Sequence, residues 1–170
     1  MSKAFTKHDA SEAPLVVRPR PPLPAGEPNY VTARGLALLR AELAALEGER
    51  AGLADDAERD DRRALLDARV AELRGRMASA RLVDPRAQPQ DEVRFGATVT
   101  LRTLTGAQGG EERRLRIVGV DEASPADGCV AFVAPIAQAV LGLRVGETAV
   151  LAVGDHEVEL EVTRIAYEET

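Results

Sequence analysis

Two stretches of the chain repeat apolar residues at alternating spacings of three and four, the seam pattern of a coiled coil. The first seam consists of Leu36, Leu39, Leu43, Leu46 and Leu53, and the second of Leu66, Val70, Leu73, Met77 and Ala80. Thr32 is suited to cap the first helix, and Asp84-Pro85 should end the second, because the residue before a proline disfavours helix. The pattern predicts an antiparallel two-helix coiled-coil hairpin over residues 30–84.

The register of this hairpin follows from the seams, because facing residues of antiparallel helices have a constant index sum. Pairing Leu39 with Leu73 gives a sum of 112 and pairing Leu43 with Val70 gives 113, which places the turn near residue 56. Arms of about 22 to 25 residues would extend roughly 35 Å. We expect the last turns to be loosely held, because arginines take seam positions there and glycines weaken the first helix. These residues are Arg50, Arg59, Arg63, Gly48 and Gly52.

Beyond residue 90 the apolar period changes to two, which is typical of strands with one buried face. Alternating runs occupy residues 97–102, 113–120, 129–134, 147–153 and 157–165. Between the third and fourth runs, PIAQAVLG (135–142) opens with proline and ends on glycine, which predicts a helix of one to two turns. Residues 91–168 should therefore form a compact antiparallel β domain with a short helix, and the whole chain should be α+β.

Residues 1–29 have a different composition from the rest of the chain, with six of its ten prolines. Proline removes backbone donors and blocks helix, so PRPPLPAGEP should be extended. We expect residues 1–29 to be a disordered Pro-rich tail outside the packed domains.

Charge and composition exclude several kinds of protein. The net charge is −6, and no segment forms a basic surface for duplex nucleic acid. The longest apolar stretch, 129–143, is interrupted by polar residues and is too short to span a bilayer, and no secretory signal is readable at the N-terminus. Cys129, the single cysteine, and the distant His8 and His156 provide no zinc site. We expect a cytoplasmic protein with no membrane segment and no metal centre of its own.

Neither His156 nor Cys129 predicts catalysis. His156 lies beside Asp155 in a predicted turn, but no Ser or Cys nucleophile is placed with it, so we expect a surface residue. Cys129, at the start of a predicted strand, should be a small core residue.

Five acidic residues crowd the predicted turn of the hairpin: Asp55, Asp56, Glu58, Asp60 and Asp61. Carboxylates on a projecting apex can share a hard cation such as Mg²⁺. Alternatively, Asp55 and Glu58 match a capping box, and acids at a helix N-terminus interact favourably with the helix dipole. The arginines of the second helix are equally open to two roles, a solvated flank or a contact with nucleic acid.

Several segments together resemble the Gre family of bacterial transcription elongation factors. They are YVTARGLALLRAELAAL (30–46), RLVD (81–84), FGATVTL (95–101), RIVGVDEA (116–123) and APIAQAVLGLRVGE (134–147). The last is close to the family's usual SPxAxALLGxxxGD. The likeness extends from about Leu23 to Tyr167, and the opening MSKAFTK and the LPAG-x-x-NY approach to the first helix are closer to the GreB branch than to GreA.

The resemblance implies a coiled-coil hairpin and an FKBP-like C-terminal domain that docks at the rim of the RNA polymerase secondary channel, while the hairpin enters the channel. It places polymerase binding on Pro135, Ile136, Ala137 and Leu141, with Asp121 and Glu122 as polar contacts or, alternatively, as domain packing. Two acidic tip residues of the family help to hold the second Mg²⁺ of the polymerase active site, so that the polymerase itself cleaves backtracked RNA. The expected partner is RNA polymerase, with nucleic acid contacted only indirectly through the elongation complex. The protein itself should be a monomer and not an enzyme, with no cofactor beyond Mg²⁺ shared with the polymerase.

The tip departs from the family pattern. No D-x-S-E-N motif occurs, and between Gly35 and Asp84 the chain is shorter than the usual Gre hairpin by about two helical turns per arm. Two turns shorten the reach by about 11 Å, whereas a carboxylate ligand must lie about 2.1 Å from Mg²⁺. Unless the docking shifts, Asp55 and Asp56 should stop short of the active site. We interpret the chain as a Gre-like polymerase binder that modulates elongation with weak or no stimulation of transcript cleavage.

Three other functions stay open at this point. The first is GreB-type stimulation of cleavage on backtracked complexes. The second is a peptide-binding or prolyl-isomerase module, which needs an aromatic-lined pocket, whereas the domain offers only Phe95, Phe132 and Tyr167. The third is a coiled-coil oligomer with no polymerase partner.

Overall fold

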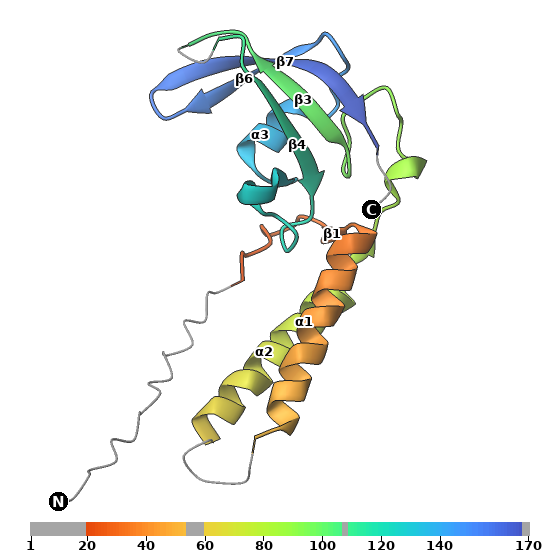
Figure 1. Ribbon diagram of the computed structural model, residues 1–170, viewed down its shortest axis with the longest axis vertical. Coiled ribbons are helices and arrows are strands. Elements are labelled where there is room, and N and C mark those ends of the chain that lie inside the picture. The colour runs from red at the N-terminus through yellow and green to blue at the C-terminus, as the bar shows by residue number, and fades with distance from the viewer. Residues whose placement is uncertain (1–19, 54–59, 107–108, 168–170) are drawn as a thin grey trace, which may run out of the picture.

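The computed structural model describes residues 20–53, 60–106 and 109–167, which form two parts joined at one end (Figure 1). Helices α1 (Ala33–Ala51) and α2 (Asp60–Ala78) lie side by side and project away from a C-terminal sheet domain. This arrangement confirms the predicted α+β fold and the helical hairpin. Within the described residues, no helix is long and apolar enough to cross a membrane.

The hairpin core contains every residue of the two predicted seams. Leu39, Leu46, Leu66, Val70 and Leu73 are buried. The other seam residues are partly buried and pack against them: Leu36, Leu43, Leu53, Met77 and Ala80. The seam spacing therefore identified the residues through which the two helices pack.

Two details of the hairpin follow the sequence pattern closely. The Thr32 hydroxyl accepts a hydrogen bond from the Gly35 amide at 2.9 Å and so caps α1 as predicted. Ion pairs join Arg62 to Glu49 at 2.8 Å and Arg69 to Glu42 at 3.9 Å. Both pairs have an index sum of 111, which agrees with the predicted register.

The described helices of the hairpin can be compared with the predicted arms, which also include residues outside the described ranges. With 19 residues apiece, the helices each span about 28 Å, against the roughly 35 Å predicted. The predicted turn near residue 56 lies outside the described residues, between the helix ends at Ala51 and Asp60.

The C-terminal domain is built on a five-stranded sheet with strand order β5-β4-β3-β7-β6. The strands are β3 (Thr98–Thr103), β4 (Glu112–Val118), β5 (Cys129–Ala131), β6 (Thr148–Val153) and β7 (His156–Ala166). The central strand β3 pairs antiparallel with β4 and β7, and β6 pairs antiparallel with β7 across a turn at Gly154, whose φ is +60°.

The sheet is mixed, which corrects the prediction of a fully antiparallel domain. β5 runs parallel to β4. The connection between them contains the 3₁₀ turn η3 (Pro125–Asp127), and it returns the chain to the level of Arg116, where Cys129 begins the pairing of β5 with β4. A tight hairpin turn would have reversed the strand direction, whereas this longer connection preserves it.

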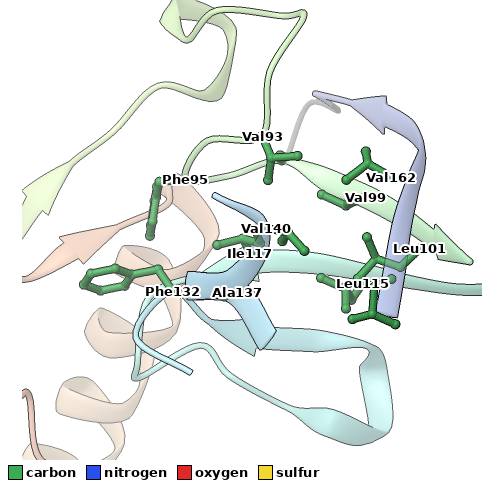
Figure 2. Close-up of a cluster of buried hydrophobic side chains, with 12 residues drawn as sticks. Val93, Phe95, Val99, Leu101, Leu115, Ile117, Phe132, Ala137, Val140 and Val162 are labelled. Carbon is green, nitrogen blue, oxygen red and sulfur yellow. The ribbon is translucent and has the colours of Figure 1, made fainter. Parts of the chain in front are cut away.

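One face of the sheet is covered by the short helix α3 (Pro135–Val140) and carries the core of the domain (Figure 2). Side chains of β3, β4 and β7, including Val99, Ile117 and Val162, meet Ala137 and Val140 of α3, and all five are completely buried. Proline at the first helical position of α3 confirms the prediction from PIAQAVLG.

A small parallel sheet, which the sequence analysis did not predict, joins the two parts of the molecule. β1 (Tyr30–Val31) immediately precedes α1 and pairs with β2 (Arg81–Leu82), which follows α2. The 3₁₀ turn η2 (Pro85–Ala87) then leads into the C-terminal domain. The two-strand pairing therefore closes the base of the hairpin.

Some residues of the segment 20–29 make tertiary contacts, although the sequence analysis assigned the segment to a disordered tail. Leu23 packs against the core of the C-terminal domain. Asn29 is 3% exposed, and its Nδ2 donates to the Arg76 carbonyl at 2.8 Å. Proline content indicates only a locally extended backbone, whereas these contacts join residues distant in sequence. The rest of the predicted tail, 1–19, lies outside the described residues.

Candidate functional site

The predicted docking residues lie on and just after α3, but they are not equally accessible. Pro135 is exposed, and Ile136 and Leu141 are half-buried. Ala137 is completely buried in the domain core (Figure 2). Pro135 and Ile136 can therefore meet a partner directly, whereas Ala137 can support that surface only through its packing.

The loop around α3 is held by hydrogen bonds that fix the orientation of this surface. Gln138 Nε2 donates to the Phe132 carbonyl at 2.7 Å. After the helix, the Gly142 amide donates to the Val93 carbonyl at 2.8 Å, with the glycine at φ +88°. A side chain would be strained at that φ, so glycine suits the turn that brings Leu141 back to the domain.

A pocket of about 340 Å³ lies beside Leu141 and has aromatic walls. Phe95 and Phe132 line it, as does Tyr30 from β1, and the three ring centroids are 5.6 to 5.8 Å apart. Tyr30 thus takes the place that the sequence analysis gave to Tyr167. The sequence analysis did not assign Tyr30 to this pocket because Tyr30 belongs to the hairpin segment, about 65 residues before Phe95, and no local pattern links the two residues.

Tyr167 has a structural role instead. Its hydroxyl donates to the Glu92 carbonyl at 2.6 Å and accepts from the Arg94 amide at 3.0 Å, so it fastens the end of the chain to the entry of the sheet domain. Partial burial, together with the nearby Glu92 carboxylate, raises the pKa of the Tyr167 phenol above its ordinary value.

Asp121 and Glu122, the predicted polar contacts, face the base of the hairpin. Their side chains are only 4% and 1% exposed. Asp121 Oδ1 accepts from Arg20 Nη1 at 2.7 Å, and Glu122 Oε2 accepts from the Thr32 hydroxyl. These contacts agree with the packing role that the sequence analysis gave as the alternative, and contact of either residue with polymerase stays a prediction.

The junction also depends on Gly35, in the first turn of α1. A Cβ at this position would lie 2.8 Å from Glu122 Oε2 and 3.4 Å from the Thr32 hydroxyl. Glycine therefore lets the helix approach the buried carboxylate closely. The Thr-x-x-Gly sequence that begins the hairpin supplies both the cap and the space for Glu122.

Only part of the acidic tip is described. Asp60 and Asp61 are exposed and occupy the first turn of α2, where negative charge favours the helix dipole. Asp55, Asp56 and Glu58 lie outside the described residues. Across the described ranges, no three side chains of the His, Cys, Asp or Glu type are grouped as a metal site. The capping and Mg²⁺-directed roles of these acids both stay predictions.

The two residues judged non-catalytic from sequence lie where expected. His156 is exposed at the start of β7, next to the turn, and Cys129 is buried with 5% exposure. Neither belongs to a group of three or more His, Cys, Asp or Glu side chains in the described part of the chain that could hold a metal ion. The described residues therefore present an exposed edge at α3 and a projecting pair of helices, and polymerase binding at α3 stays a prediction.

Comparison with known proteins identifies relatives of this chain. A family model described as "Transcription elongation factor, GreA/GreB, C-term" matches residues 88–167. A protein named transcription elongation factor GreA from Alkalilimnicola ehrlichii is 31% identical over 155 residues, covering 81% of this chain and 96% of its own. The protein of the same name from Desulfovibrio desulfuricans is 30% identical over 154 residues, covering 81% and 89%.

A solved structure described as the prokaryotic transcription elongation factor GreA/GreB from Nitrosomonas europaea is 20% identical, covers 83% of this chain and 99% of its own, and has a TM-score of 0.41. Both of these relatives are named GreA, whereas the family model and the solved structure name GreA and GreB together, so the closer likeness to GreB stays a prediction. The family model covers the whole sheet domain, and relatives at 30% identity or more extend through the hairpin. The chain therefore belongs to the GreA/GreB family of transcription elongation factors.

Proposed function

We propose that this protein binds RNA polymerase at its secondary channel and modulates elongation, with weak or no stimulation of transcript cleavage. Its membership of the GreA/GreB family supports the role of elongation factor. In this proposal the α3 surface docks at the channel rim and the hairpin enters the channel. The protein acts in the cytoplasm as a monomer, and it is not itself an enzyme because the catalytic centre belongs to the polymerase.

The length of the hairpin is the observation that carries the proposal. Each described helix has 19 residues, about 28 Å, and the tip lacks the family's D-x-S-E-N motif. Coordination of Mg²⁺ requires the carboxylate oxygen to lie about 2.1 Å from the metal. A shortfall of even a few ångströms would remove that ligand, whereas docking through α3 would be unaffected.

Stimulation of cleavage is the second candidate, and the acidic tip favours it. Asp60 and Asp61 are exposed on the hairpin, next to three further acids in the sequence. This charge is suited to attract Mg²⁺ if the docking brings the hairpin deeper into the channel than its length indicates. The two candidates share one partner and differ in the reach of the tip.

Docking through α3 can be tested with a matched pair of variants. Pro135 and Pro125 are both exposed prolines in the first turn of a short helix, α3 and η3 respectively. We expect Pro135→Asn to weaken binding to core polymerase and Pro125→Asn to leave it unchanged, as measured by titration with labelled protein. A folded Pro135→Asn variant with full affinity would remove the α3 assignment.

A further inference from the structure

The N-terminal segment 20–29 connects the two parts of the molecule through Arg20. In Figure 1 this segment lies below the C-terminal domain and beside the upper part of the hairpin. Arg20 Nη1 donates to Asp121 of the domain at 2.7 Å, and Nη2 donates to both carboxylate oxygens of Glu42 on α1, also at 2.7 Å. One guanidinium group therefore holds a carboxylate from each part, which its forked geometry suits.

The neighbouring residues of the segment reinforce this bridge. Arg76 of α2 donates from Nη2 to the Pro21 carbonyl at 2.5 Å, and its Nε lies 3.4 Å from Asp121 Oδ2. Leu23 packs into the core of the C-terminal domain. Segment 20–29 is thus fixed to the domain by Leu23 and to both helices by Arg20 and Pro21.

Burial makes these contacts more than surface pairing. The side chains of Arg20, Arg76 and Asp121 are 14%, 13% and 4% exposed. Burial alone would lower the pKa of the Arg20 guanidinium, but its hydrogen bonds to Asp121 and Glu42 outweigh burial and raise that pKa above its ordinary value. Removal of Arg20 would leave the buried Asp121 carboxylate with less compensation, which is costly in a partly dry environment.

The position of Glu42 gives the bridge mechanical leverage. The other junction contacts described above lie at the first turn of α1 or the last turn of α2, through Thr32, Asn29 and the β1–β2 pair. Glu42 lies ten residues beyond Thr32, about 15 Å along the helix axis. A contact at that distance from the base resists tilting of the hairpin more effectively than a contact at the base itself.

We propose that residues 20–29 form a strap that sets the angle between the hairpin and the C-terminal domain, with Arg20 as its positioning residue. The strap would direct the hairpin tip, because a small change of angle at the base moves the far end most. This inference concerns the free protein and does not depend on polymerase binding.

Distances between spin labels in the full-length protein test the strap directly. Nitroxide labels at Ala64→Cys on α2 and Thr148→Cys on β6, in a Cys129→Ala background, report the hairpin angle by double electron-electron resonance. We expect one narrow distance distribution with Arg20 present, and a broader or shifted one in Arg20→Ala. Arg20→Lys should give an intermediate width, because a single ammonium nitrogen cannot hold Asp121 and Glu42 with two separate donor nitrogens, as Nη1 and Nη2 do.

Matched controls separate the strap from a general loss of packing. Arg74→Ala removes an exposed ion pair to Glu47 inside the hairpin, and we expect it to leave the distribution unchanged. Glu42→Gln should broaden the distribution as Arg20→Ala does, and the double variant should broaden it by less than the sum of the two, because the contact between Arg20 and Glu42 is common to both changes. Circular dichroism verifies that each variant is folded. An unchanged distribution in folded Arg20→Ala and Glu42→Gln would overturn the proposal.

Discussion

The C-terminal domain and the hairpin bury their side chains in different geometries. The core of the domain collects twelve buried residues from strands, loops and α3 into one cluster, whereas the buried residues of the hairpin follow one row between two helices. A residue in that row has neighbours only along the seam and across it, so the far end can change with little effect on the base. In the proposed function, docking depends on the domain, whose core is one cluster, and reach depends on the hairpin.

The hairpin itself shows the same contrast along its length. Its fully buried side chains end at Leu46 and Leu66. Beyond them, Arg50 pairs with Asp67 at 2.5 Å, but both side chains are about half exposed, so the pair adds little stability. Gly48 lies inside α1 in the same region and weakens the helix, whereas Gly52, predicted to do the same, is the C-cap residue that follows Ala51.

The largest effect should come from the aromatic cluster that links the two parts. Phe132 is buried and contacts the rings of Tyr30 and Phe95. We expect Phe132→Ala to lower the free energy of unfolding by about 3–5 kcal/mol, measured by chemical denaturation, and Phe132→Leu to lower it by less. If Phe132→Ala lowers the free energy of unfolding by less than a substitution in the hairpin does, the domain core is not the more tightly packed of the two regions.

The hairpin should show a gradient from base to tip. Leu73 near the base is 1% exposed, whereas Leu53 near the tip is only partly buried. We expect Leu73→Ala to cost about 3 kcal/mol and Leu53→Ala less than about 1 kcal/mol, since its side chain keeps part of its contact with water. Equal losses in a denaturation series would contradict a tip that is loosely held.

The cap of α1 should contribute less to the free energy of unfolding than the buried side chains of the two cores. The Thr32 hydroxyl satisfies the Gly35 amide and also donates to Glu122. We expect Thr32→Ala to cost about 1–2 kcal/mol, and Thr32→Ser to stay close to the native value because it keeps the hydroxyl. A large loss in Thr32→Ser would indicate that the methyl group, not the hydroxyl, stabilises the junction.

The smallest effect concerns Tyr167 and depends on pH. Loss of its two hydrogen bonds in Tyr167→Phe should cost about 1 kcal/mol at neutral pH. Since folding raises the pKa of this phenol above 10.0, its contribution is present below pH 10 and declines as pH rises through the folded-state value. Between pH 8 and pH 11, the free energy of unfolding should therefore fall less steeply with pH in Tyr167→Phe than in the native protein. Identical slopes would contradict this role.

The helices and strands could be predicted from the sequence because each depends on the spacing of apolar residues within a short segment. Seam spacing was sufficient for α1 and α2, and Thr32 and Pro135 were recognisable as helix starts from their residue types. The parallel placement of β5 and the β1–β2 pair depends on how distant segments return to each other. Period-two alternation is the same in parallel and antiparallel strands, so the sequence could not distinguish the two kinds of pairing.

The candidate site was less predictable for the same reason. Pro135, predicted to contact polymerase, is exposed, but Ala137 of the same prediction is buried because α3 lies on the sheet core. Arg20 bonds to Asp121, 101 residues later, and nothing in its Pro-rich surroundings marks that contact. Asp121 and Glu122 directly follow a run of apolar residues that ends at the buried Val120. That place in the sequence could have indicated that their own side chains are buried.

The central claim, binding without efficient cleavage, is tested most directly on stalled, backtracked elongation complexes. The protein is added alone and in competition with a Gre factor that stimulates cleavage, and release of the 3′ RNA fragment is measured. We predict that it suppresses cleavage by the competitor while releasing little RNA itself. Robust release by the protein alone, abolished when Asp55 and Asp56 are both changed to Asn, would contradict the claim and show that the tip reaches the active site.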